Sequence, residues 1–442
     1  MIKLDKNAVY ALQPFNMHSV LMYHRLKNDG YHVACFFDQN VVLHTRCYDT
    51  AYIQQAHYNP QYTVIICHRA ETTEIREIRE RLLSIGYHKA DILDSDEEIQ
   101  TETSIYQAAA MADLQGFAAV KPYLFESSYN HDLAELKKLR RLNELGAPDG
   151  GLVYVPFDKY EHQELYRDSE GKEHILLYRC EFDITNRCSL KCKNCANLMQ
   201  YFEHPEDIPQ SQVVSDYKKL LSLVDWIDNF LILGGEPLMH PDLPKIIKEI
   251  LDDPLTDQRV GQVRLLTNGT IPLPDKLIDV LKGSNVCLWI SNYGEKSRKL
   301  GQIINQCIDN GIYYRILPIT TWKDICQFAP RDEPFSDSEL LSLRRSCATY
   351  CRSVSSGKMF LCAFINGAHH LQMVPPDSRN YVDLCAENAK EQMVNYLDKS
   401  TPMPPACSWC SGNSLEQWSK AHDVPAAIQV PSALPYRKFV AE

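Results

Sequence analysis

The sequence predicts an α/β protein with two successive series of alternating strands and helices, followed by a small cysteine-rich region. Apolar runs of strand length alternate with amphipathic helical stretches before residue 105, and the same alternation returns from residue 176. Six cysteines then fall between residues 347 and 410. The 442 residues are enough for two or three domains with real cores.

Composition and charge restrict the class of partner. The chain has no run of eighteen apolar residues, so we expect no membrane partner. The first twenty residues lack the pattern of a secretory signal, which predicts a cytoplasmic protein. The net charge is −11 and no long basic run occurs, which argues against a nucleic-acid partner.

Residues 1–105 predict a Rossmann-like α/β domain. This segment resembles the N-terminal domains of sugar-modifying enzymes of surface glycan synthesis. Its first turn, QPFNMHS, has none of the glycines that let a backbone approach a pyrophosphate, so we do not expect dinucleotide binding. Asp38 ends the second strand, where it could bind a ribose or simply be solvated. The expected strands are 7–12, 31–38 and 62–67, and the expected helices are 18–30 and 74–86.

Residues 106–175 predict a connector. An amphipathic helix is expected over 131–146, and the polar stretch 160–174 is typical of a hairpin.

Residues 176–335 predict a partial (β/α)6 TIM-like barrel. In such folds the chemistry lies at the carboxyl ends of the strands, and every motif below falls at such an end. The expected strands are 179–185, 229–235, 262–269, 285–294 and 312–319, and the intervening helices are 212–224, 241–253, 275–283 and 296–311.

The loop after the first of these strands carries Cys188, Cys192 and Cys195 in the pattern C-x3-C-x2-C. Three thiolates on one loop can bind three irons of a 4Fe–4S cube and leave the fourth iron without a protein ligand. The alternatives are a zinc knuckle, for which His204 is the nearby fourth ligand, or reactive thiols.

Further motifs follow the next strands. Gly234, Gly235, Glu236 and Pro237 end the second strand, where glycines permit close backbone approach and the carboxylate could pair with an ammonium group. Asn268 and Ser291 end the third and fourth strands. Alternatively, the first segment is only a turn that starts a helix, and the two polar residues only cap helices.

The C-x3-C-x2-C loop and the GGEP segment forty residues later resemble the radical S-adenosylmethionine (SAM) superfamily. Asn194 departs from the pattern, because that position is often aromatic in the family. The resemblance implies that SAM binds the open iron, with residues 234–237 holding its amino group and with Asn268 and Ser291 contacting its carboxylate and ribose. It also implies a flavodoxin- or ferredoxin-type electron donor, reductive cleavage of SAM, and a 5′-deoxyadenosyl radical that abstracts hydrogen from a substrate.

Residues 336–442 resemble the auxiliary-cluster domain called SPASM, or its shorter form, twitch. The resemblance rests on C-x9-G-x4-C with Gly357 as the glycine, and on a C-x2-C pair. It implies a second, auxiliary 4Fe–4S cluster, for which Cys351 competes as first ligand, whereas a zinc ribbon with four cysteine ligands is the alternative. The implied ligands are Cys347, Cys362, Cys407 and Cys410.

Three functions remain open at this point. We favour dehydrogenation or epimerisation of a small substrate such as a sugar or nucleotide sugar, with Cys351 as a hydrogen-atom donor and Cys326 and Cys287 as other spare thiols. Radical modification of a ribosomal peptide or partner protein is the second candidate, and a non-catalytic iron–sulfur or zinc scaffold is the third.

Overall fold

A computed structural model of the chain confirms the mixed α/β class. It divides into two compact units, Met1–Val153 and Tyr154–Glu442, each described below by itself. The finer division at residues 105, 175 and 335 remains a prediction. Over the part of the chain that the structure describes, no helix is both long and apolar enough to cross a membrane. The described residues are 4–38, 45–48, 51–68, 73–95, 99, 105–112, 128–146, 164–168, 170–324, 326–347, 351–412 and 420–439.

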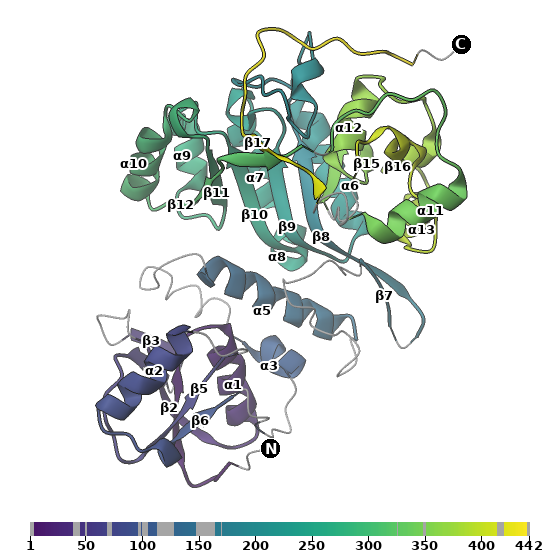
Figure 1. Cartoon of the computed structure of the whole chain (residues 1–442). Coiled ribbons are helices and arrows are strands. Elements are labelled where there is room, and N and C mark those ends of the chain that lie inside the picture. Colours follow the sequence, from purple (N-terminus) through teal and green to yellow (C-terminus); the bar gives the residue numbers. More distant parts are fainter. Residues whose placement is uncertain are drawn as a thin grey trace. The chain divides into compact units, whose positions relative to one another are not determined.

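The first unit contains a six-stranded sheet in the order β3-β4-β2-β1-β5-β6 (Figure 1). Its neighbouring strands run parallel except for the β3–β4 pair. The strands are β1 (Val9–Gln13), β2 (His32–Phe37), β3 (Thr45–Tyr48), β4 (Ala51–Gln54), β5 (Tyr62–Ile66) and β6 (Ile92–Asp94). The helices are α1 (Met17–Asn28), α2 (Thr73–Ser84), α3 (Ile105–Met111) and α5 (Ser128–Glu144).

Side chains hold the turn between β1 and α1, which has no glycine. Asn16 and Ser19 form a reciprocal capping box that begins α1. The buried Asp38 carboxylate accepts a hydrogen bond from the backbone N–H of Phe15 at 3.2 Å. Asp38 therefore binds the turn between β1 and α1. The alternative that this acid is simply solvated is wrong, because its side chain is buried.

The second unit is organised around a sheet in the order β12-β11-β10-β9-β8-β14-β15-β16, with β7 paired to β8. The strands are β7 (Leu165–Arg167), β8 (Glu173–Asp183), β9 (Trp226–Leu233), β10 (Val260–Thr267), β11 (Cys287–Asn292), β12 (Tyr313–Pro318), β14 (Cys351–Ser355), β15 (Lys358–Phe360) and β16 (Tyr381–Asp383). The antiparallel pair β7–β8 matches the predicted hairpin, of which residues 160–163 and 169 lie outside the described part.

Helices cover one face of this sheet; the opposite face, called the polar face below, carries Arg179, Glu181 and Arg264 together with apolar residues such as Leu231. They are α6 (Gln210–Leu223), α7 (Leu243–Asp252), α8 (Pro254–Arg259), α9 (Asp275–Leu281) and α10 (Leu300–Asn310). Phe182 of β8 and Phe230 of β9 each lie 4.9 to 6.1 Å, ring to ring, from one another and from Tyr217 of α6. Because side chains alternate along a strand, residues between these core positions face away from the helices.

The C-terminal region extends the same sheet. Strand β14 runs parallel to β8, so residues that follow β12 by more than thirty positions lie beside the first strand of the series. This region adds α11 (Asp337–Ser346), α12 (Ala363–His370) and α13 (Ala389–Leu397). A two-stranded pair, β13 (Thr321–Lys323) with β17 (Asp423–Pro425), connects the segment after β12 to the C-terminal tail.

Candidate functional site

The loop after β8 brings Cys188, Cys192 and Cys195 together. Burial raises the pKa of all three thiols, and the neighbouring cysteines raise those of Cys188 and Cys192 further, the latter to about 11. The three sulfurs are thus neighbours in a low-dielectric environment that disfavours free thiolates. Iron stabilises the thiolate form, so this donor set fits a 4Fe–4S cluster.

Asp207 tethers the beginning of the cysteine loop. Its carboxylate accepts a hydrogen bond from the Thr185 hydroxyl at 2.6 Å and pairs with the Arg187 guanidinium at 2.9 Å. The Thr185 hydroxyl in turn accepts from the backbone N–H of Arg187 at 3.0 Å. These contacts fix the chain just before Cys188.

Gly234 and Gly235 allow the end of β9 to pack directly on this loop. The Gly235 N–H donates to the Thr185 carbonyl at 2.8 Å. A Cβ atom would lie 2.4 Å from that oxygen at Gly234, and 2.3 Å from the Arg187 carbonyl oxygen at Gly235. Both distances are shorter than any tolerated contact, so only glycine fits at either position.

The Glu236 carboxylate is fully buried and engaged by the chain itself. It accepts hydrogen bonds from the Leu238 N–H at 3.1 Å, the Thr267 hydroxyl at 2.9 Å and the Asn268 N–H at 2.8 Å. Burial raises its pKa to about 7 despite these donors. The carboxylate thereby joins the ends of β9 and β10, and its expected pairing with an ammonium group stays a prediction.

Asn268 connects the end of β10 to the cysteine loop. Its amide nitrogen lies 3.1 Å from the Ser189 hydroxyl and 3.7 Å from the Cys188 sulfur. Its side-chain oxygen accepts from the Thr270 N–H at 3.0 Å, a local turn that does not cap a long helix. The structure therefore places Asn268 at the triad.

The end of β11 contributes Ser291 and a residue that the sequence motifs did not indicate. Tyr293 is hydrogen-bonded to Ser291, and burial raises the pKa of its phenol, with the three triad cysteines adding to that shift. Ser297 bridges the two strand ends, because its hydroxyl contacts the Asn268 carbonyl at 2.8 Å and the Ser291 carbonyl at 2.9 Å. An aromatic residue two positions after Ser291 was the available signal for Tyr293.

The C-terminal tail pairs with the cysteine loop. Backbone N–H groups of Lys193 and Val430 donate to Ile428 and Lys191 carbonyls, at 2.7 and 2.8 Å. Between them, the Gln429 side-chain amide lies 3.2 Å from the Cys192 sulfur. Since hydrogen bonds to cluster sulfurs tune an iron–sulfur centre, the tail belongs to the site.

A second group of cysteines forms in the C-terminal region. Cys347 and Cys410 raise the pKa of both Cys362 and Cys407, and Cys362 also raises that of Cys407. Burial raises the pKa of Cys362 and Cys407 most. The structure thus brings the four predicted auxiliary ligands together.

Cys326 joins this second group, although its sequence position predicted only a spare thiol. It is hydrogen-bonded to Cys410, which is the main reason that its pKa is raised. The backbone explains the proximity, because Phe328 forms a β-bridge with Cys410 and the Ser411 N–H donates to the Gln327 carbonyl at 2.8 Å.

Cys351 lies apart from the second group. It begins β14 opposite Arg179 of β8 and is hydrogen-bonded to Glu181. Burial raises its pKa to about 12, so the thiol form prevails at neutral pH.

Two other residues considered in the sequence lie elsewhere. Cys287 begins β11 opposite Arg264, and the zinc-ligand candidate His204 is exposed.

Within the described ranges, no three His, Cys, Asp or Glu side chains surround a point where a single metal ion could bind. That arrangement is the one a mononuclear zinc site requires. In an iron–sulfur cube each thiolate binds a different iron, so the ligands need not converge on one point.

Asp183 links the cysteine loop to the C-terminal region. Its buried carboxylate accepts hydrogen bonds from Ser353 at 2.6 Å, Asn366 at 2.6 Å and Asn197 at 3.0 Å. Burial raises its pKa to about 7, and the three donors oppose that shift. A small cavity lined by Asp183, Asn197, Asn366 and His370 adjoins this network.

Comparison with known proteins gives a family match over the central strands. Residues 182–291 match the model described as "Radical SAM superfamily". A probable GTP 3′,8-cyclase of Methanococcus maripaludis is 38% identical over 104 residues, which are 24% of this chain and 32% of the relative. An S-adenosylmethionine-dependent nucleotide dehydratase of Selenomonas ruminantium is 31% identical over 105 residues, 23% of this chain and 34% of the relative. The chain thus spans about a third of the length of these curated relatives.

Comparison with solved structures gives matches at low similarity. BtrN in complex with AdoMet and 2-DOIA gives a TM-score of 0.33 at 13% identity and covers 51% of this chain and 89% of that chain. Streptococcus suis SuiB bound to the precursor peptide SuiA gives 0.28 at 13% identity and covers 45% and 52%. Similarity at this level does not define an activity.

Proposed function

Because the chain contains a radical SAM domain, we propose that it is an enzyme that uses SAM to abstract hydrogen from a small substrate, a sugar or nucleotide sugar. The radical SAM family uses a 4Fe–4S cluster and SAM, and the bound pair supplies a 5′-deoxyadenosyl radical when an electron is delivered. The observation that carries the proposal is the proximity of Cys188, Cys192 and Cys195 on one loop, which the ends of three neighbouring strands hold in place.

The chain's own residues have distinct roles in this proposal. The three thiolates hold the cluster, while Asn268 and Gln429 donate hydrogen bonds to sulfurs. Asn268 and Ser291 contact SAM, and the backbone of residues 234–237 holds its amino group. Glu236 positions that backbone, because the hydrogen bonds that its carboxylate accepts come from the chain itself.

The proposal also covers the fold of both units, an auxiliary cluster and the electron donor. The sheet from β8 to β12, which runs in chain order with helices on one face, folds as a partial barrel, and residues 1–105 form a Rossmann-like domain. Cys347, Cys362, Cys407 and Cys410 hold an auxiliary 4Fe–4S cluster of the twitch type. A flavodoxin- or ferredoxin-type protein supplies the electron.

The choice of a small substrate draws support from the relatives. The names of the M. maripaludis and S. ruminantium proteins describe enzymes that act on nucleotides, and they are similar to this chain over 24% and 23% of its length. Cys351 is our candidate hydrogen-atom donor, since it is a protonated thiol on the strand beside β8.

The decisive experiment measures 5′-deoxyadenosine formed from SAM and dithionite by the anaerobically reconstituted full chain. We expect product from the wild type, and none from Cys192→Ala, whereas Cys385→Ala, which removes an exposed cysteine outside both groups, should retain it. Absence of 5′-deoxyadenosine in the wild type would overturn the proposal. Hydrogen abstraction from a peptide, in place of nucleotide sugars, would favour peptide modification instead.

A further inference from the structure

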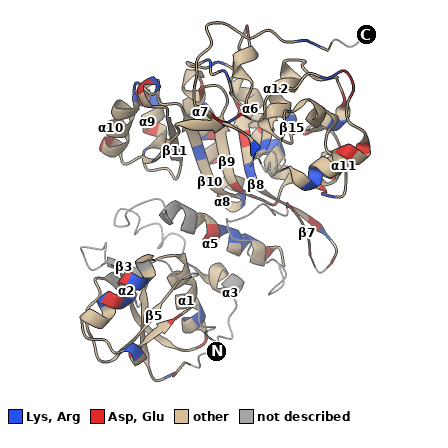
Figure 2. Ribbon diagram, in the orientation of Figure 1, with Lys and Arg blue, Asp and Glu red and all other residues tan. Residues whose placement is uncertain are grey.

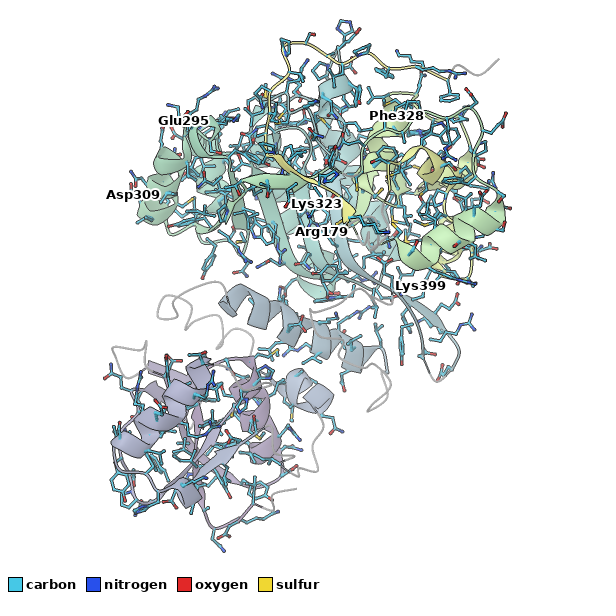
Figure 3. All side chains as sticks on the ribbon, in the orientation of Figure 1. Arg179, Glu295, Asp309, Lys323, Phe328 and Lys399 are labelled. Carbon is cyan, nitrogen blue, oxygen red and sulfur yellow. The ribbon has the colours of Figure 1, made fainter. Side chains whose placement is uncertain are left out.

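Three arginines lie on the polar face of the second unit's sheet. In β8, Cys180 and Phe182 belong to the core under the helices, so the intervening Arg179 and Glu181 face the other way. The same alternation in β10 buries Val263 and Leu265 and turns Arg264 outward from the helices. Figure 2 shows Lys and Arg positions on these central strands, and Figure 3 labels Arg179.

Trp289 of β11 is in contact with two guanidinium groups. Its neighbours in the strand, Leu288 and Ile290, are core residues, which places the indole on the polar face. The Arg264 guanidinium carbon lies 4.1 Å from the ring centroid and that of Arg315, from β12, lies 5.5 Å away. Trp289 and Arg315 are also register partners across the strand pair. The indole therefore orients two cations that would otherwise repel one another.

The positive charge of this group exceeds the negative charge around it. Arg179 pairs with Glu181 at 2.6 Å. Among the described residues, no ion pair with a carboxylate is formed by Arg264 or Arg315. Burial lowers the pKa of Arg264 to about 10, and the charges of Arg179 and Arg315 add to this shift, although Cys287 opposes it. The three guanidinium groups and the Glu181 carboxylate leave an excess of about two positive charges, with Arg264 half-buried and Arg315 exposed. Asp183, two positions after Glu181 on the same face, has a pKa raised to about 7 by burial and reduces this excess when it is ionised.

This group lies close to the predicted SAM residues. Ser291 follows Trp289 by two positions on β11, which places it about 7 Å further along the same face. Cys351, opposite Arg179, borders the group on the other side. A ligand held by the arginines would thus lie within the sheet's polar face, between the site for SAM and the candidate hydrogen donor.

We propose that Arg179, Arg264 and Arg315, with Trp289 holding the last two in place, bind a phosphate or diphosphate group of the substrate. This inference rests on the proposed function and narrows it, because it makes the substrate a phosphorylated small molecule. Guanidinium groups present paired N–H donors that match phosphate oxygens, and an excess of about two charges suits a phosphoryl dianion better than a single carboxylate.

The test titrates inorganic pyrophosphate into the anaerobically reconstituted full chain in the presence of SAM, by isothermal calorimetry. We expect saturable binding that weakens by at least about tenfold in Arg315→Gln and in Arg264→Gln, since each loses a charge-assisted contact. Arg379→Gln removes an exposed arginine that pairs with Asp377, and it should bind as the wild type does. Arg315 is exposed, so its variant carries the test if Arg264→Gln does not fold.

Equal pyrophosphate affinity in the wild type and both variants, or no binding at all, would overturn the assignment. Malonate binding as tightly as pyrophosphate would overturn the choice of phosphate. Formation of 5′-deoxyadenosine, measured on the same samples, separates the two proposals. If pyrophosphate binding depends on the arginines but no 5′-deoxyadenosine forms, the anion site stands and the proposed enzyme is refuted. If 5′-deoxyadenosine forms but pyrophosphate binding does not depend on the arginines, the proposed enzyme stands and the anion site is refuted.

Discussion

The side-chain amide of Gln429 lies 3.2 Å from the sulfur of Cys192, across 237 positions of sequence. A hydrogen bond to a cluster sulfur stabilises the reduced, more negative state of the cluster. Gln429→Met keeps the volume and removes this donor together with the side-chain oxygen that accepts from the Lys191 N–H at 2.7 Å. The backbone bonds from Lys193 to Ile428 and from Val430 to Lys191 remain.

We expect the reduction potential of the triad cluster in Gln429→Met to fall by about 40 mV, equivalent to one hydrogen bond of about 1 kcal/mol for a one-electron couple. A redox titration followed by electron paramagnetic resonance measures this. Gln302→Met, at an exposed position on α10, should leave the potential unchanged. An unchanged potential in Gln429→Met would show that the tail only covers the loop.

Gly235→Ala should prevent the cysteine loop from packing on β9. Its Cβ would meet the Arg187 carbonyl oxygen at 2.3 Å, so the backbone must move, at a cost of about 2–3 kcal/mol. Iron content after reconstitution and the midpoint of urea unfolding should both fall. Gly301→Ala is the control, because no atom lies within 4 Å of its added Cβ on α10, and it should stabilise by up to about 1 kcal/mol.

Five cysteines share the second group, but a cube takes four protein ligands. We expect about eight irons per chain in the wild type, about four in Cys407→Ala, and about eight in Cys326→Ala. Anaerobic iron and sulfide analysis provides the count. A loss of four irons in Cys326→Ala together with a full count in Cys347→Ala would make Cys326 the ligand in place of Cys347.

The buried Asp183 predicts a pH dependence of folding. Its pKa is about 7 in the folded protein and near 4 when unfolded, so between these values the folded state holds a proton that the unfolded chain has released. The free energy of unfolding should therefore fall as the pH rises from 4 to 7, by at most about 4 kcal/mol. Urea unfolding of the cluster-free protein at pH 5 and pH 8 measures this.

Asp183→Asn should reduce that dependence, since the amide does not titrate, and the slope that remains belongs to Glu236, whose pKa is also raised to about 7. The exposed Asp252→Asn should retain the slope of the wild type. A wild-type stability that rises between pH 5 and pH 8, or a slope that is not reduced in Asp183→Asn, would contradict the assignment.

The sequence could predict those strands and helices that have a strong hydrophobic pattern of their own. The apolar runs that became β8 to β12 are separated by amphipathic helices, and that pattern leads to a parallel sheet with its motifs at one edge. Asn268 could be placed near Cys188 for the same reason, because carboxyl ends of neighbouring parallel strands meet.

The parts that could not be predicted depend on pairing between distant segments. Nothing in the short run Cys351–Ser355 indicates that it lies beside β8, since strand pairing leaves no local mark on either partner. The same holds for Cys326 beside Cys410 and for Gln429 beside Cys192. The sequence also could not show that the Glu236 carboxylate accepts hydrogen bonds from the chain itself, because a motif specifies residue types and not the donors that surround them.

The pairing of residues 428–430 with residues 191–193 has a consequence for biosynthesis. Translation proceeds from the N-terminus, so the cysteine loop leaves the ribosome long before the segment that completes its hydrogen bonding. Any iron–sulfur carrier that delivers its cargo to the nascent polypeptide meets an open loop, and the finished environment of Cys192 arises only once residues 428–430 have been synthesised.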